Sequence, residues 1–196
     1  TICTGRMYAS ALPYVKQLGF ELPIITYNGA YVKHSATGEI LYQRFLPCHL
    51  AKDIYLRAKS RGLHANIYYQ DRLYVDSLNT WGKNYASRVK VDINVVENML
   101  DFLEDEPIKI VTLAQAEDIN HFEQELIEAH GEQLYITRSV PTFLEILHPE
   151  ATKGKGLEAV ANYLQVPREN IMGIGDNFND VEMFNYAGFA VVMGNG

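Results

Sequence analysis

Residues 171–180 read Ile-Met-Gly-Ile-Gly-Asp-Asn-Phe-Asn-Asp, and this stretch decides how the rest of the chain is interpreted. The apolar run 171–175 predicts a strand, and Asp176 stands at its carboxyl end. Two carboxylates and two amides then crowd a strand-to-helix turn. In a parallel sheet with helices on both faces, ligands bind at the carboxyl ends of the strands. The stretch therefore predicts an α/β fold with a polar site at this turn.

The oxygen-rich turn suits a hard cation. Mg²⁺ prefers a few carboxylates together with water and phosphate oxygens. We therefore expect Asp176, Asn179 and Asp180 to bind Mg²⁺. A purely structural turn is the alternative, because Asp and Asn also favour turns and helix N-caps for local hydrogen-bonding reasons. A Ca²⁺ loop fits poorly, since Val181 stands where such a loop needs glycine.

Two further polar segments precede predicted helices. Thr4-Gly5-Arg6 follows a short apolar strand, and a hydroxyl and a glycine before a helix can cradle phosphate. Lys153, in Thr-Lys-Gly, precedes an amphipathic helix and can neutralise a phosphoryl oxygen. An ordinary N-cap and a solvated lysine are the alternatives. If the functional interpretation is right, the Lys153 ammonium lies within salt-bridge reach of Asp176 or Asp180.

The order of predicted elements divides the chain into three ranges. Residues 1–46 read as strand, helix, strand and hairpin, and residues 147–196 return to helix and strand alternation. Between them, residues 47–146 carry the pattern of a small α+β layer. We expect an α/β core interrupted by an inserted module. An apolar strand is already under way at Thr1, so we expect the sequence to be an internal piece of a longer protein.

Composition narrows the classes of function. The net charge is −7 and no Lys/Arg run occurs, which argues against a nucleic-acid-binding surface. The apolar stretches are far shorter than the roughly 20 residues that span a bilayer. Only Cys3 and Cys48 are present, too few for a disulfide framework, so we expect a reducing, cytoplasmic setting without membrane attachment.

Taken in order, these segments resemble one family. Thr-Gly-Arg, Asn-Gly, an insertion, Lys-Gly and Gly-Asp-x-x-Asn-Asp are similar to the motifs of the haloacid dehalogenase-like (HAD) hydrolases. The resemblance is closest to the Cof-type sugar-phosphate phosphatases and covers nearly the whole chain. Ile-Thr-Tyr-Asn-Gly-Ala around Asn28 and Phe-Leu-Glu-Ile-Leu before Lys153 also match that pattern. It implies a Rossmann-like parallel-sheet core with an inserted α+β cap of the C2 type.

The resemblance also implies a mechanism and a set of site residues. It implies Mg²⁺-dependent hydrolysis of small phosphate monoesters, such as sugar phosphates, through an aspartyl-phosphate intermediate. The family's first motif, Asp-x-Asp-Gly-Thr, is absent, so the nucleophile and the general acid/base are expected outside these residues. The implied catalytic residues are Thr4, Lys153, Asp176 and Asp180; the implied substrate-binding residues are Thr4, Gly5, Arg6, Asn28, Lys153 and Asn179; the implied metal ligands are Asp176, Asn179 and Asp180.

Three alternatives stay open at this point. A phosphomutase of the same superfamily would need a cluster of basic residues in the cap. An ion-pump domain shares the chemistry, but no membrane span is visible and Arg6 stands where pumps carry Asp. A non-enzymatic binding protein on the same scaffold is the third. The expected partner is a small phosphorylated metabolite, and the expected state is a monomer or weak homodimer.

Overall fold

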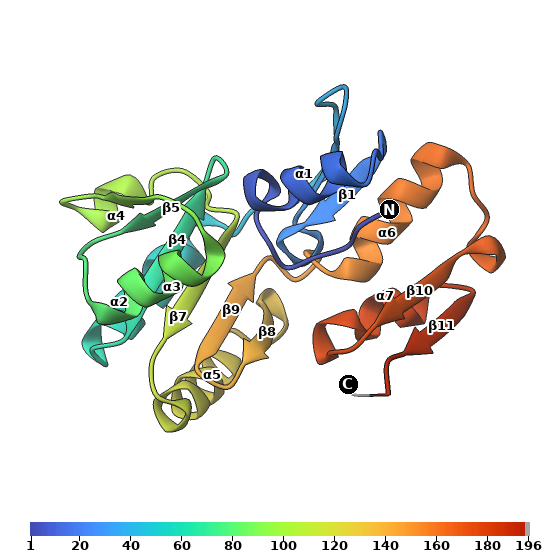
Figure 1. The fold of residues 1–196 in the computed structure, drawn as a ribbon. Helices are drawn as coiled ribbons and strands as arrows, with labels where there is room; N and C mark the ends of the chain where they lie inside the picture. Colours follow the sequence, from blue (N-terminus) through green and yellow to red (C-terminus); the bar gives the residue numbers. More distant parts are fainter. Residues whose placement is uncertain (195–196) are drawn as a thin grey trace. The chain divides into compact units, whose positions relative to one another are not determined.

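The computed structural model describes residues 1–194, so the last two residues of the range 147–196 lie outside the described residues. The chain divides into two compact units. Unit 1 combines residues 1–44 with the stretch that begins at Glu150, and unit 2 is the intervening segment Phe45–Pro149. In Figure 1, unit 1 joins the blue segments to the orange and red ones, and unit 2 has the colours between them.

Unit 1 is built from eight helices and strands and three short 3-10 turns within the described residues. In chain order they are α1 (Tyr8–Gln17), β1 (Pro23–Thr26), η1 (Tyr27–Gly29), β2 (Tyr31–His34), β3 (Ile40–Gln43), α6 (Lys153–Leu164), η3 (Arg168–Asn170), β10 (Met172–Gly175), η4 (Phe178–Asp180), α7 (Val181–Tyr186) and β11 (Phe189–Val192).

Strand β1 lies between two helices. Successive side chains of a strand point to opposite faces. Accordingly, Ile24 packs in a cluster with Tyr8 and Val15 of α1. Ile25 packs in a different cluster, with Leu157 and Val160 of α6 among its members. All four strand residues of β1 are buried, which explains its continuous apolar character.

Parallel strand pairing occurs twice among the described residues of unit 1. Strands β10 and β11 pair in parallel, and Cys3 forms a parallel bridge with Ile25 of β1. Strands β1, β2 and β3 form an antiparallel sheet, as the hairpin signals around residues 36–38 predict. The predicted α/β class, with parallel strands and covering helices, is confirmed.

Unit 2 contains a six-stranded mixed sheet in the order β6-β5-β4-β7-β9-β8. All its strand pairs are antiparallel except β5 with β6. Its elements are α2 (Cys48–Ser60), β4 (His64–Tyr69), β5 (Arg72–Val75), α3 (Thr80–Val89), β6 (Ile93–Val95), α4 (Met99–Phe102), β7 (Lys109–Leu113), α5 (Ala116–His130), η2 (Gly131–Gln133), β8 (Tyr135–Val140) and β9 (Phe143–Leu147).

The structure differs from the sequence-based expectation at two places in unit 2. The segment 80–102, where the sequence analysis assigns no elements, forms α3, β6 and α4. Asp71-Arg72, between two apolar runs, predicts the turn of a hairpin, but the β4–β5 hairpin turns one residue earlier, at Gln70 and Asp71, with φ values of 47° and 57°. Two consecutive left-handed residues are typical of the tight hairpin turn whose twist matches the strands.

Helices α2 and α5 both contribute to the main hydrophobic core of unit 2. Ile54 and Ala58 of α2 pack with Ile119, Phe122 and Leu126 of α5, and all five side chains are fully buried. Among residues 1–194, no helix has both the length and the apolar character needed to cross a bilayer.

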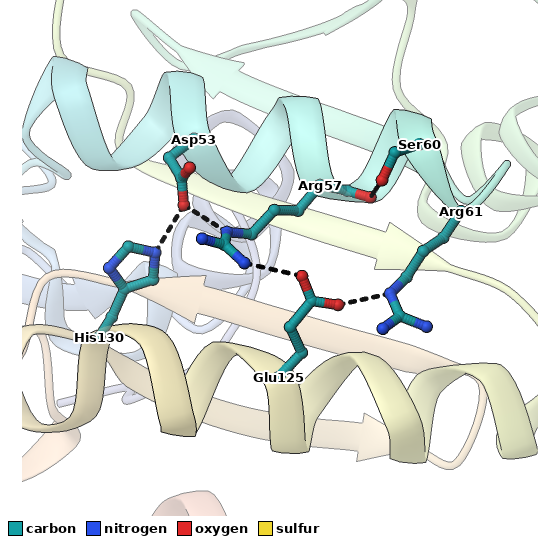
Figure 2. A network of polar contacts seen from close by, with 6 residues as sticks. All are labelled: Asp53, Arg57, Ser60, Arg61, Glu125 and His130. Carbon is teal, nitrogen blue, oxygen red and sulfur yellow. Dashed lines mark hydrogen bonds and ion pairs between the residues drawn. The ribbon is translucent and has the colours of Figure 1, made fainter.

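A network of ion pairs joins α2 to α5 beside that core (Figure 2). Arg57 Nε lies 2.6 Å from Asp53 Oδ2, and its terminal nitrogen lies 2.8 Å from Glu125 Oε1. Arg61 Nε reaches the other oxygen of Glu125 at 2.5 Å, and His130 Nε2 lies 2.8 Å from Asp53 Oδ2. Each carboxylate therefore meets two nitrogen-bearing side chains.

These contacts lower the pKa of both the Asp53 and the Glu125 carboxyl. Burial favours the protonated form of Glu125, but hydrogen bonds from Arg57 and Arg61 outweigh it and hold the pKa of that carboxyl below its usual value. A carboxyl whose pKa is lowered by folding stabilises the fold above its unfolded-state pKa. That contribution is lost as the pH falls through the folded-state pKa.

We predict that Glu125→Gln destabilises unit 2 by about 1 kcal/mol at neutral pH, because partly exposed ion pairs are screened by solvent. The difference in unfolding free energy between wild type and variant should have its full size above the ordinary glutamate pKa of about 4.3. That difference should disappear as the pH falls through the lower folded-state pKa of Glu125. Urea unfolding of wild type and variant across this pH range measures it. Glu128→Gln, on an exposed position of the same helix, is the matched control. A difference that persists unchanged at low pH contradicts the prediction.

Candidate active site

The Thr4-Gly5-Arg6 segment leaves the short parallel bridge and leads into α1. The Thr4 amide donates to the Ile25 carbonyl at 2.9 Å, which fixes the segment beside the carboxyl end of β1. The Arg6 amide donates to Thr4 Oγ1 at 3.2 Å. The Arg6 guanidinium lies over the Tyr14 ring of α1, with Cζ 5.6 Å from the ring centroid. The hydroxyl of Thr4 is therefore held before a helix N-terminus, as its assigned role requires.

Lys153 is the first residue of α6 and is buried. Its helix begins there because Thr152 caps it, with Oγ1 accepting from the Lys155 amide at 3.2 Å. Lys153 Nζ lies 2.5 Å from Asp180 Oδ1, and the two side chains are only 7% and 5% exposed. The prediction that Lys153 lies within salt-bridge reach of the acidic turn is confirmed, and Asp180 is its partner.

Asp180 also organises the turn that carries it. Its Oδ2 accepts from the amides of Asp176 at 3.0 Å and Asn177 at 3.1 Å. Asn177 completes a capping box with Asp180 at the start of η4. The strand preceding the turn ends in Gly175, where an added Cβ would lie 2.5 Å from Asp180 Cγ. Only glycine therefore allows the carboxylate to fold back over the strand end.

The contacts of Asp180 set its charge. Burial favours the protonated form, but the hydrogen bond and positive charge of Lys153, with the two amide donors, hold the pKa of the Asp180 carboxyl below its usual value. The nearby Cys3 thiol responds in the opposite direction. Desolvation raises its pKa to about 12, with Lys153 opposing the rise and Asp180 adding to it. Its environment therefore favours the neutral thiol at physiological pH.

Asn28 and Asn179 meet although 151 positions separate them. Asn179 Nδ2 donates to Asn28 Oδ1 at 3.0 Å, and both residues are buried. Asn28 is fully buried at 0% exposure, so its assignment to substrate binding stays an untested prediction that this burial does not favour. Because the Asn179 nitrogen is the donor, its amide oxygen is the atom that can be offered to a cation.

The residues at the turn fit a magnesium site only in part. Asp176 is exposed at the strand end, and the Asn179 amide lies three residues further on. Both oxygens of Asp180 already accept hydrogen bonds, which favours a positioning role for that carboxylate. Among residues 1–194, no group of three or more His, Cys, Asp or Glu side chains is placed to hold a metal. One exposed carboxylate and one amide suit Mg²⁺, which keeps several waters and takes phosphate oxygens as ligands.

The structure brings most of the predicted residues together and adds others. Lys153 joins Asp180, and Asn28 joins Asn179, all within unit 1. Capping by Asp or Asn at this turn is expected from the sequence only as an alternative, and Asn177 takes that role; the need for glycine at position 175 is not predicted. A signal for both exists in the sequence, because Gly-Asp-Asn is itself a turn pattern.

An apolar cavity of about 390 Å³ lies in unit 1 between α6 and β10, with Leu157, Val160 and Ile174 among its lining residues. The predicted polar site residues do not line it. The lining of this cavity is mostly apolar and does not suit phosphate. The candidate active site is therefore identified from the polar contacts described above and not from this cavity.

Comparison with known proteins agrees with this geometry. The family described as haloacid dehalogenase-like hydrolase matches residues 1–196. The chain belongs to the haloacid dehalogenase-like hydrolases. The family prediction made from the motifs is therefore confirmed.

Individual relatives are similar over the full length of the chain. The chain is 28% identical to a 5-amino-6-(5-phospho-D-ribitylamino)uracil phosphatase of Bacillus subtilis, over 100% of the chain and 73% of that protein. A solved structure from Thermotoga maritima superposes with a TM-score of 0.85 at 31% identity, covering 100% of this chain and 74% of that one. A solved sugar phosphatase of HAD subclass IIB gives a TM-score of 0.85 at 22% identity, covering 99% and 73%, which shows the shared fold.

We predict that Lys153→Met destabilises unit 1 by about 3–5 kcal/mol, because it leaves the buried Asp180 carboxylate without its counter-charge. Lys155→Met is the matched control two residues along the same helix. Lys155 pairs with Glu158 at 3.0 Å, but both side chains are 40% or more exposed, so a loss within about 1 kcal/mol is expected. Urea unfolding measures both variants. Equal losses in the two would show that the buried pair contributes no more than a surface pair.

Proposed function

We propose that this chain is part of a Mg²⁺-dependent phosphatase that hydrolyses small phosphate monoesters. One observation carries the proposal: the buried ion pair of Lys153 with Asp180 joins the Lys-Gly segment to the Gly-Asp-x-x-Asn-Asp segment. The ammonium is thereby fixed in unit 1, in the same body as the Thr4-Gly5 segment. A fixed cation near a hydroxyl and backbone amides is suited to hold a phosphoryl group.

Each predicted site residue of the three polar segments has a proposed role. Thr4, Gly5 and Arg6 bind phosphoryl oxygens through the hydroxyl, the backbone and the guanidinium. Lys153 neutralises charge that develops on the phosphoryl group, and Asp180 holds that ammonium in place. A fixed ammonium needs no reorganisation when the reaction proceeds, which lowers the free energy of the transition state.

Asp176 and the oxygen of Asn179 are the proposed protein ligands of Mg²⁺, and Asp180 supports them by holding the turn through the Asp176 and Asn177 amides. When bound, Mg²⁺ would screen the negative charge that a carboxylate and a phosphate place close together. The nucleophilic Asp, which forms the aspartyl-phosphate, and the general acid/base are proposed to come from residues outside these 196. The similarity to longer phosphatases, of which the chain covers about three quarters, supports this.

Unit 2 is proposed to act as a cap that excludes water and contacts the leaving group. Its separate core and its insertion between the two halves of unit 1 support this role. The substrate is proposed to be a sugar phosphate or similar phosphorylated metabolite, since the Bacillus subtilis relative is described as a phosphatase of such a small molecule. The proposed setting is the cytoplasm, with the protein as a monomer or weak homodimer.

A phosphomutase is less well supported, because three of the candidate basic residues of unit 2 are already in ion pairs. Arg57 and Arg61 are paired with Glu125, and Lys59 Nζ lies 2.6 Å from Asp76. Cations neutralised in this way are poor candidates for holding the second phosphate of a bisphosphate.

We predict that Asp176→Asn lowers kcat at least about 100-fold in the full-length enzyme and raises the Mg²⁺ concentration needed for half-maximal activity. A steady-state assay of phosphate release from a panel of sugar phosphates, with Mg²⁺ titrated, measures both. Glu169→Gln, which removes an exposed charge in η3 of the same unit, should leave both values unchanged. Full wild-type activity in excess EDTA would refute the proposed metal dependence.

A further inference from the structure

The segment Tyr27-Asn28-Gly29 has an unusual backbone. Its φ values are 52°, 56° and 103°, so three consecutive residues lie in the left-handed region. Glycine reaches that region freely and asparagine tolerates it, but tyrosine rarely adopts it. All three residues are buried, and Tyr27 and Asn28 are 0% exposed. Such a conformation persists only where the surroundings hold it in place, and it is concentrated at functional sites.

One side of this turn holds the Thr4-Gly5-Arg6 segment. The Tyr27 amide donates to the Arg6 carbonyl at 2.9 Å, and the Asn28 amide donates to the Thr4 carbonyl at 3.1 Å. A Cβ on Gly5 would lie 2.8 Å from Asn28 Oδ1. The turn therefore fixes the backbone on both sides of Gly5, and the Asn28 side chain occupies the space that a larger residue would need.

A second side of the turn meets the start of α6 with backbone against backbone. A Cβ on Gly29 would lie 1.9 Å from the Thr152 carbonyl oxygen. One helical turn later, a Cβ on Gly156 would lie 3.2 Å from the Gly29 Cα. Because the contact of Gly29 with Thr152 requires glycine and that of Gly156 with Gly29 is tight, the helix that carries Lys153 is packed directly against the turn.

The third contact is the hydrogen bond from Asn179 to Asn28. Both residues are buried, so this bond satisfies polar atoms away from water and is costly to break. The bond ties the turn to η4, whose Asp180 holds Lys153. The same three residues thus contact all three segments that carry the predicted chemistry.

We infer that Tyr27-Asn28-Gly29 is the positioning element of the site, and that Asn28 is its key positioning residue. Asn28 acts through others: its backbone fixes Thr4, and its side chain fixes Asn179. This inference rests on the proposed phosphatase function for its catalytic consequence. The three-way contact itself is independent of that function.

The experiment compares Asn28→Gly with Thr26→Val in the full-length enzyme. Glycine keeps the left-handed backbone and removes only the amide. Thr26 is equally buried, one residue before the turn, and its Oγ1 donates to the Tyr31 carbonyl at 2.9 Å, away from the site segments. Each substitution removes a side-chain hydrogen bond of a fully buried residue, so both variants should lose stability and unfolding is measured for each alongside the kinetics.

Their functional effects should differ. Misplaced catalytic groups lose rate steeply, so Asn28→Gly should lower kcat by about 10–100-fold with a smaller change in KM. It should also raise the Mg²⁺ concentration for half-maximal activity, because the Asn179 amide loses its hydrogen bond to Asn28. Thr26→Val should leave both values at wild type. Equal kinetics for the two folded variants would overturn the inference.

Absence of phosphate release by the wild-type enzyme would refute the proposed function but not the positioning role of the turn. Amide hydrogen exchange then tests the positioning role without an activity assay. Asn28→Gly should then speed amide exchange in residues 4–6 and 177–180 together. Thr26→Val should confine faster exchange to the β1–β2 hairpin. Unchanged exchange in both site segments of Asn28→Gly would overturn the inference.

Discussion

The ion pair between Lys153 and Asp180 is the interaction on which the arrangement of unit 1 depends. The two side chains are nearly buried and their charged atoms lie 2.5 Å apart, so each charge is too poorly solvated to be stable without the other. Desolvation makes such a pair costly unless its remaining hydrogen-bonding capacity is used. Asp180 meets this condition by accepting two backbone amides with its second oxygen. The pair therefore fixes α6 and the 175–180 turn to each other and orders the turn as well.

Close backbone approach is the second constraint, and it follows from the first. Lys153 can reach Asp180 only if the start of α6 lies deep in the unit. That position is possible because residues 29, 154 and 156 are glycines: an added Cβ on Gly154, for example, would lie 2.4 Å from the Glu182 carbonyl oxygen. The small residues have no chemistry of their own. They allow elements far apart in the sequence to bring charged and amide side chains together.

Unit 2 also contains a buried ion pair, and the contrast is instructive. Lys109 Nζ lies 2.6 Å from Glu145 on adjacent strands β7 and β9, with side chains 3% and 8% exposed. The sheet register sets Glu145 opposite Val111, so Lys109 and Glu145 are diagonal cross-strand neighbours within reach of long side chains. The pair in unit 1 joins a helix N-terminus to a loop and has no such regular frame. It depends on caps, glycines and a left-handed turn, which is the kind of local strain that functional sites carry.

The sequence by itself determined the α/β class, most strands and helices of unit 1, and the segments that carry chemistry. Apolar runs, helical spacing and turn residues act over a few positions, so they are visible in the order of residues. It also allowed Lys153 to be linked with the acidic turn. It did not reveal α3, β6 and α4, of which β6 and α4 are only three and four residues long.

Only the tertiary structure decided which carboxylate pairs with Lys153, that Asn28 is fully buried, and that it bonds Asn179. Such facts depend on where a chain segment lies after more than a hundred intervening residues have folded. No local preference of Asn28 specifies a partner 151 positions away. Its turn-forming preference is local and readable, whereas its partner is set by the packing of α6 and η4 around the turn.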